Sequence, residues 1–265
     1  MLLRNVFTKT LRDLRWPTFW VGLSLAVGGA YFTALYPAYK SLLGDMVKQI
    51  PPAMQSLLAG TDWDISTATG FLNIELFPLI LPALMAGYAI ALCSGFTAGE
   101  ESRGTIDVLL SFPVPRWRVV IDKVAALIVS LAVVSLVMLV GIQIGAIIGG
   151  TTVDVGRVAA GLALATILAL ALGMSALALA AWTGNRNAAL GIPIGVMVVM
   201  YLVQSLSGNI EYLKSINFLS LFHYYLGHTP LVHGLNLADA FVLLAVGVVF
   251  LALGVIGFER RDLSA

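Results

Sequence analysis

The chain is poor in charged residues. Asp, Glu, Lys and Arg make up only 11% of its 265 residues, whereas 59% are hydrophobic, and the mean hydropathy is +0.95. A soluble domain typically carries about 25% charged residues, so this composition predicts a membrane protein. The net charge of +1 provides no basic surface, and we therefore expect no nucleic-acid partner.

Cysteine and the usual motifs of metal and nucleotide sites are also scarce. The single Cys93 lies inside an apolar run, which excludes an internal disulfide. The three histidines between residues 223 and 233 are spaced by five, so a helix would point them in different directions, and we expect no metal site. No GxxxxGK[ST] phosphate loop occurs, so the chain has no ATP site of that kind.

Six apolar runs are long enough to cross the hydrocarbon core of a bilayer, which takes about 20 residues of helix. They cover residues 16–36, 73–98, 124–149, 158–182, 188–206 and 238–258. Because the runs are continuous rather than alternating, they predict helices and not the strands of a barrel. The first run is longer than the apolar core of a signal peptide, about 7–15 residues, and is interpreted as a retained span.

Lys and Arg residues divide unequally between the two sides of this arrangement. With the N-terminus in the cytoplasm, eleven of the fifteen lie in cytoplasmic segments and four in outer segments. An excess of positive charge marks the cytoplasmic side. We therefore expect an all-α, multi-pass protein of the cytoplasmic membrane, with six spans, both termini inside and a single domain over residues 1–265.

The first fifteen residues have an amphipathic pattern. Apolar side chains, Phe7 among them, recur at helical spacing, while Arg4, Lys9 and Arg12 lie between them. We expect residues 1–15 to form a helix in the membrane interface, with its basic residues among lipid headgroups and with Pro17 ending it. The alternative is a basic leader that only orients the first span.

Small residues recur at every fourth position in two of the spans. Gly141, Gly145 and Gly149 form a double GxxxG in the third span, and residues 161–173 of the fourth repeat the spacing with Gly and Ala. Such residues let helices approach closely within lipid. Because the two spans are neighbours in the sequence, we expect packing within one chain rather than a dimer face.

Charges deep in the spans are few. Glu75 and Asp239 lie near the outer ends of the second and sixth spans, which argues against a proton-coupled transporter or an ion channel. A path poor in charge suits a hydrophobic or amphipathic substrate, whose binding residues the sequence does not identify. The outer segment 207–237 is hydrophobic and rich in aromatics, which predicts an interfacial belt or short helices against the membrane face. Kinks are expected at Pro78, Pro82 and Pro193.

Residues 99–123, the charged segment, concentrate eight charged side chains between two apolar runs. The pattern predicts two short helices around Pro113, one from about Thr105 to Phe112 and one opening at Pro115. The exposed apolar face of the first helix predicts a contact with a cytoplasmic partner protein that buries it. The alternative is a loop that packs on its own helices. Three basic residues are expected to meet lipid phosphates at the membrane boundary: Arg116, Arg118 and Lys123.

The charged segment resembles the first cytoplasmic loop of ABC-2-type permeases. The resemblance rests on Glu101-Ser102-Arg103-Gly104-Thr105, Leu109-Leu110-Ser111, Pro113-Val114-Pro115-Arg116 and Lys123. Six spans, a basic amphipathic start and a hydrophobic last outer segment extend the resemblance over most of the chain. Pro115 departs from the small polar residue that is common at this place in the family.

The resemblance implies the membrane subunit of an ATP-driven exporter. In the family this loop is a coupling helix that docks on a separate ATP-binding subunit, which holds the ATP and magnesium. This chain is therefore expected to be no enzyme and to need no cofactor. A second permease copy or a paralogue is expected to complete a path lined by the second and fifth spans. The expected docking residues are Glu101, Arg103, Gly104, Thr105, Leu109, Leu110, Pro113, Arg116 and Lys123.

Two other functions fit parts of the pattern. Glu100 and Glu101 near Arg103 are similar to the motif of CAAX-protease-like intramembrane enzymes. The spacing is wrong, however, and the histidines fall on the opposite side of the membrane, where they are out of reach. A structural or assembly subunit without a transport path of its own is the other alternative.

Overall fold

The structure is a computed structural model that describes residues 6–47, 67–101, 115–208 and 210–261, and every regular element in these ranges is helical. The long helices are α1 (Val6–Val47), α4 (Ile80–Phe96), α7 (Arg116–Ile148), α8 (Val155–Thr183), α9 (Arg186–Leu206) and α13 (Leu237–Arg260). The short ones are α3 (Ala68–Glu75), α5 (Ala98–Glu101), α10 (Glu211–Ile216), α11 (Leu221–Leu226), α12 (Pro230–His233) and the 3-10 turn η1 (Asn217–Leu219). The predicted all-α membrane protein is confirmed.

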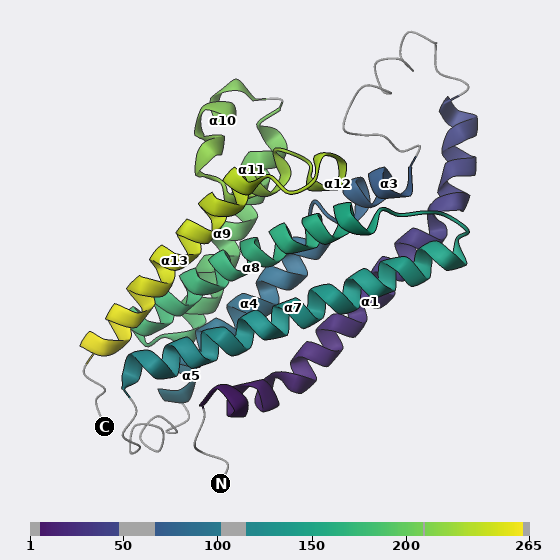
Figure 1. The fold of residues 1–265 in the computed structure, drawn as a ribbon. Coiled ribbons are helices and arrows are strands. Elements are labelled where there is room, and N and C mark those ends of the chain that lie inside the picture. The colour runs from purple at the N-terminus through teal and green to yellow at the C-terminus, as the bar shows by residue number, and fades with distance from the viewer. Residues whose placement is uncertain (1–5, 48–66, 102–114, 209, 262–265) are drawn as a thin grey trace.

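Five helices are each long and apolar enough to cross a membrane: α1, α7, α8, α9 and α13. Helices α3 and α4 pass the same test together, with a bend of 52° between them, so they make a sixth span if the pair is counted as one. Figure 1 shows the start of α1, helix α5 and the end of α13 at one end of the bundle, and α3, α10 and α12 at the other. The start of α1 and the end of α13 therefore lie at the same end of the bundle, as they would with six spans.

Helix α1 is longer than the sequence predicts, and Pro17 does not end it. The helix is continuous over Val6–Val47, with Pro17 inside. Proline removes one backbone hydrogen bond, and the hydroxyl of Thr18 donates to the Leu14 carbonyl at 2.7 Å, a bond that bends a helix without interrupting it. Figure 1 shows the first turns of α1 at an angle to the rest. The predicted break is therefore wrong, whereas the interfacial placement of these turns stays a prediction.

Helices α1 and α7 meet in a close parallel contact, the glycine seam. A Cβ atom on Gly141 would lie 2.6 Å from the Cα of Ala26, and one on Gly145 would lie 2.7 Å from the Cα of Ala30, so neither position has room for a side chain. Each glycine of α7 faces an alanine of α1 at the same separation in the sequence, so the two helices pack in a single register along the contact. The facing residues are Gly141, Gly145 and Gly149 on α7 and Ala26, Ala30 and Ala34 on α1.

The small residues of α8 face other neighbours. Gly161 lies against Phe77 and Leu231, and Gly173 lies against Ala89 of α4. The two stripes of small residues therefore both serve contacts within the chain. They do not serve one contact between α7 and α8, because the glycines of α7 face α1.

The second span is interrupted between α3 and α4, with Pro78 in the break. The Leu81 N–H bonds to the Leu76 carbonyl, which leaves the Phe77 carbonyl without its helical partner. The hydroxyl of Tyr225 in α11 donates to this carbonyl at 2.8 Å. Tyr225 is fully buried, and burial raises the pKa of its phenol, so the hydroxyl keeps its proton. The predicted kink at Pro78 is confirmed, and a residue far along the chain stabilises it.

The described part of residues 207–237 forms short helices, as predicted, and these pack on the spans, whereas their contact with the membrane face stays a prediction. Phe222 is buried and meets the ring of Tyr201 edge-on at 5.5 Å between centroids. The Ser220 hydroxyl donates to the Met200 carbonyl at 2.8 Å, which ties the segment to α9. Pro193 lies inside α9, which is continuous through it.

We expect Gly145→Ala to destabilise the protein. The added methyl group would overlap the backbone of Ala30, and overpacking of this kind costs about 1–3 kcal/mol. Gly28→Ala is the matched control, because its Cβ would meet nothing within 4 Å and alanine favours a helix. Thermal denaturation in detergent measures the difference. Equal midpoints for the two variants would contradict the seam.

We expect Tyr225→Phe to destabilise the break in the second span. Phenylalanine keeps the ring but leaves the Phe77 carbonyl unpaired in a buried position, at a cost of about 1–3 kcal/mol. Amide hydrogen exchange around residues 76–81 should become faster. Tyr212→Phe is the control, since Tyr212 is exposed on α10 and its loss should leave those amides unchanged.

Candidate functional site

The structure describes the two flanks of the charged segment. Helix α5 ends at Glu101, and α7 begins at Arg116 with Pro115 as its N-cap residue. The second predicted short helix is therefore the first part of α7 rather than a separate piece. The first predicted helix lies outside the described residues, as do six of the expected docking residues: Arg103, Gly104, Thr105, Leu109, Leu110 and Pro113.

Lys123 is buried at the end of α4. Its side chain is only 4% exposed, and its Nζ donates to the Phe96 carbonyl at 2.7 Å while lying 5.8 Å from the centre of the Phe96 ring. Phe96 is the last residue of α4, where carbonyls have no partner within the helix and attract cations. The predicted contact of Lys123 with lipid phosphate is therefore wrong, because a helix end inside the bundle takes the ammonium group.

Arg116 has the corresponding role at the end of α13. Its Nη1 donates to the carbonyl of Arg261 at 3.0 Å and lies 3.5 Å from the carbonyl of Phe258. The side chain is half-buried, whereas the neighbouring Arg118 is exposed. The first two turns of α7 therefore hold the ends of two other helices, α4 and α13.

The turn between α8 and α9 lies at the same end of the bundle. Gly184 closes α8 with φ of 64°, and the side chain of Asn185 accepts two backbone N–H bonds that start α9. The guanidinium of Arg261 fills the space beside Gly184, and the Cδ of Arg186 lies 3.6 Å from where a Cβ on Gly99 would stand. The flank of the charged segment that precedes it, α5, is thus in contact with α9. The flank that follows it, the start of α7, is in contact with α4 and α13.

A cluster of three hydroxyl groups joins α1, α4 and α7, and the sequence reasoning missed it. Thr18 lies 2.6 Å from Ser130 and 2.9 Å from Tyr88, and Tyr88 lies 2.5 Å from Ser130. Hydrogen bonds of this kind hold helices together inside a membrane. The only signal in the sequence is the presence of hydroxyl residues within or beside apolar runs.

The residues of the predicted interfacial helix that the structure describes are Phe7, Lys9 and Arg12, and Arg4 lies outside the described ranges. Lys9 and Arg12 are exposed at the start of α1, whereas Phe7 is half-buried. Their contact with headgroups remains a prediction.

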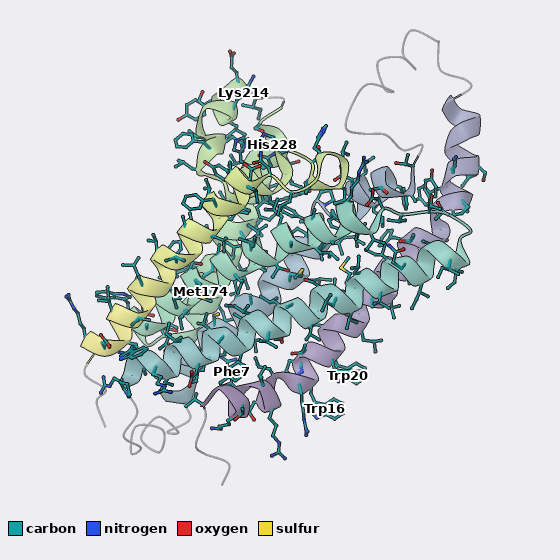
Figure 2. The ribbon with its side chains drawn as sticks, in the orientation of Figure 1. Phe7, Trp16, Trp20, Met174, Lys214 and His228 are labelled. Carbon is teal, nitrogen blue, oxygen red and sulfur yellow. The ribbon has the colours of Figure 1, made fainter. Side chains whose placement is uncertain are left out.

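The histidines lie at the opposite end of the bundle from α5, as the position of His228 in Figure 2 shows. His228 Nδ1 is 2.6 Å from a carboxylate oxygen of the buried Asp239, and His223 Nδ1 is 3.1 Å from the amide of Asn217. Within the described ranges, no three His, Cys, Asp or Glu side chains come together as metal ligands would.

Residues 4–263 match the model of the ABC-2 family transporter proteins, which is nearly the whole chain. The chain belongs to this family. ABC-2 proteins form the membrane component of ABC transporters and associate in general with an ATP-binding subunit. A comparison with curated proteins finds no significant match.

In an ABC-2 protein the charged segment stands between two spans, and here its flanks contact several others. We expect Lys123→Met to lower stability by about 1–3 kcal/mol, because it leaves the Phe96 carbonyl unpaired. Arg118→Met removes an exposed cation five residues away and should change stability by less than about 0.5 kcal/mol. Denaturation midpoints in detergent compare the two, and an equal loss would show that Lys123 is not a structural cap.

Proposed function

We propose that this chain is the permease subunit of an ABC exporter that moves a hydrophobic or amphipathic substrate across the cytoplasmic membrane. ATP hydrolysis in a separate subunit drives the movement, with ATP and magnesium bound there. The observation that carries the proposal is the family match over residues 4–263, together with a charged segment that stands between two spans. The low charge of the spans favours a substrate of this kind.

Coupling in this proposal begins at residues 102–114, which dock on the ATP-binding subunit. Closure of that subunit pushes the segment and therefore the start of α7. Arg116 passes the movement to the end of α13, and Lys123 passes it to the end of α4. Packed helices respond to such a push as rigid bodies rather than by continuous deformation.

The end of the bundle that carries α5 and the charged segment faces the cytoplasm in this proposal, because the excess of Lys and Arg lies there. A second permease copy or a paralogue completes the transport path. Helix α9 presents exposed apolar side chains that lipid or this second chain would cover: Ile192, Val196, Val199 and Leu206.

The alternative of an assembly subunit without its own path differs in one measurable respect. A permease that transports its substrate stimulates the ATPase of its partner when the substrate is present, whereas an assembly subunit does not. Co-expression with the ATP-binding subunit and ATPase assays in lipid discs with lipids, peptides and drugs distinguish the two functions.

We expect the double variant L109D/L110D to abolish docking. Two acidic side chains in a buried apolar contact should weaken binding of the ATP-binding subunit by more than about tenfold. Co-purification of the two subunits and stimulated ATPase activity are the measurements.

The matched control is F218D/L219D, which makes the same kind of change at two exposed apolar residues of η1, at the opposite end of the bundle. This control should retain both the partner and the stimulation. If L109D/L110D also retains both, the charged segment is not the docking surface.

A further inference from the structure

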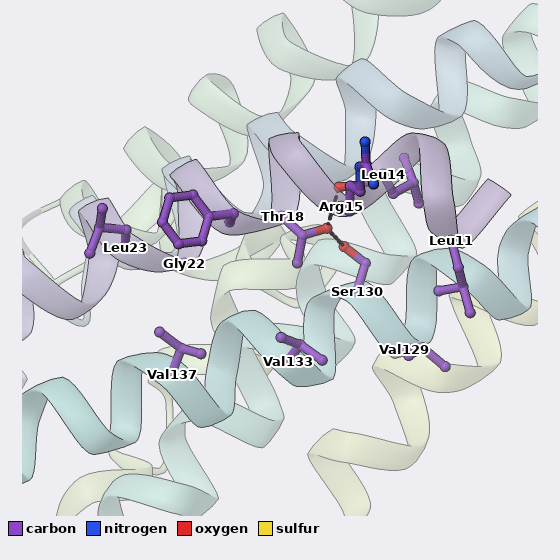
Figure 3. Close-up of a pocket in the computed structure, with 11 residues that line it drawn as sticks. Leu11, Leu14, Arg15, Thr18, Gly22, Leu23, Val129, Ser130, Val133 and Val137 are labelled. Atoms are coloured by element: carbon purple, nitrogen blue, oxygen red, sulfur yellow. Dashed lines mark hydrogen bonds between the residues drawn. The ribbon is translucent and has the colours of Figure 1, made fainter. Parts of the chain in front are cut away.

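A groove of about 410 Å³ lies between α1 and α7, in the range of volumes that bind small molecules. Figure 3 shows it from close by, with one wall from each helix. Both walls are mainly apolar, and the polar residues stand together in one part of the groove. The lining residues that the argument uses are Arg15, Thr18 and Leu23 on α1 and Ser130, Val133 and Val137 on α7.

The groove opens away from the bundle. Phe19 and Val133 on its two walls are 51% and 43% exposed, so the opening faces the surroundings of the protein. Its inner side is closed by the hydroxyl cluster, since Thr18 and Ser130 line the groove while Tyr88 lies behind them. Figure 2 shows Trp16 and Trp20 projecting outward from the same part of α1. In a membrane protein, such an opening meets lipid.

The groove runs along α1 and α7 towards the glycine seam. A Cβ atom on Gly22 would lie 3.7 Å from Val137, and from Gly141 onward the helices are in backbone contact. Arg15, Thr18 and Ser130 lie at the polar end of the groove, nearer the start of α1, while Leu23 and Val137 lie at the end nearer the seam. Polarity therefore falls from the membrane surface towards its centre, as it does along a phospholipid.

The charge at the polar end fits an anionic headgroup. Lys9, Arg12 and Arg15 are exposed on the first turns of α1, against one exposed carboxylate, Asp13, and no acidic residue lines the groove. The guanidinium of Arg15 lies 5.8 Å from the centre of the Trp16 ring, and arginine beside tryptophan is typical of a membrane interface.

The hydroxyl protons of the cluster are already used within the protein. Thr18 donates to the Leu14 carbonyl at 2.7 Å, so it accepts from the other two hydroxyl groups, and the protons of Ser130 and Tyr88 are shared among the three oxygens of the cluster. The hydroxyl groups therefore offer a ligand only acceptor lone pairs. Arg15 is the residue at the polar end that supplies hydrogen-bond donors to an anion.

We propose that this groove binds one anionic glycerophospholipid from the leaflet in which α1 begins. The phosphate lies at Arg15, and one acyl chain lies along Val133, Leu23 and Val137 towards the glycine seam. The inference depends on the membrane placement of α1 and α7 and not on the proposed docking of an ATP-binding subunit.

The test uses the full chain extracted into detergent with phosphatidylglycerol or phosphatidylcholine, followed by native mass spectrometry of the retained lipid. We expect preferential retention of one phosphatidylglycerol. Arg15→Gln should reduce this retention about fivefold, which is the contribution of one cation near an anionic surface. Val133→Phe should abolish retention of the lipid by filling the groove.

Two matched controls separate the groove from general effects. Arg118→Gln removes an exposed cation at the same end of the bundle, and Val140→Phe enlarges an exposed residue of α7 outside the groove. Both controls should retain the lipid as the unchanged chain does. Inorganic phosphate in excess should not displace it, because the acyl chain contributes to binding.

Three results would overturn the proposal. The first is equal retention of the two lipids, and the second is equal loss in the groove variants and their controls. The third is an efficient disulfide between two copies of a Val133→Cys chain in native membranes, which would show that a second copy covers the groove. Cys93 is fully buried and does not interfere with this measurement. None of these readouts requires an ATP-binding subunit, so failure here leaves the coupling proposal unaffected.

Discussion

A carbonyl group at a helix end or break has no water to bind inside a membrane, and the contacts of this bundle depend on that constraint. Lys123 supplies the donor for the end of α4, Arg116 for the end of α13 and Tyr225 for the break before α4. Each donor comes from a different helix from the one it completes. Satisfying these three backbone groups therefore also links α7 to α4 and α13, and α11 to the second span.

The sequence predicts the spans well because their signal is local. Six apolar runs correspond to five continuous helices and one bent pair, and Pro78 marks the bend. Helix ends are harder to predict when tertiary contacts compensate for a breaking residue. Pro17 shows this, since α1 packs closely on α7 and remains a continuous helix with the proline inside it.

Part of the candidate site can likewise be predicted from the sequence, and part cannot. The pattern of the charged segment is visible in the sequence and leads to the family, which the match over residues 4–263 establishes. The pairing of Lys123 with a carbonyl of residue 96 is not visible, because it depends on where α4 ends in space. From the sequence, a lysine at a membrane boundary that caps a helix end cannot be distinguished from one that contacts lipid phosphate, because only the fold shows which helix end lies beside it. The hydroxyl cluster also cannot be predicted from the sequence, because it depends on how three helices pack together.

The basic residues at the start of α1 and those at the start of α7 illustrate two uses of positive charge. Lys123 lies inside the bundle and neutralises the partial charge of a helix end, so it contributes to the shape of the protein. Arg15 remains at the surface beside an apolar groove, where a ligand outside the chain can reach it. Burial distinguishes these two uses, and the composition of the sequence does not.

The glycine seam has a consequence for how this protein can change during evolution. In most helix contacts a larger residue on one side is accommodated by a smaller one on the other, so that pairs of positions vary together. Here the residues of α7 are already glycine, and those facing them are alanine. A larger residue on α1 has no compensating change available on α7. These positions should therefore remain constant among related chains instead of covarying, and the contact would be invisible to methods that detect contacts from correlated substitutions.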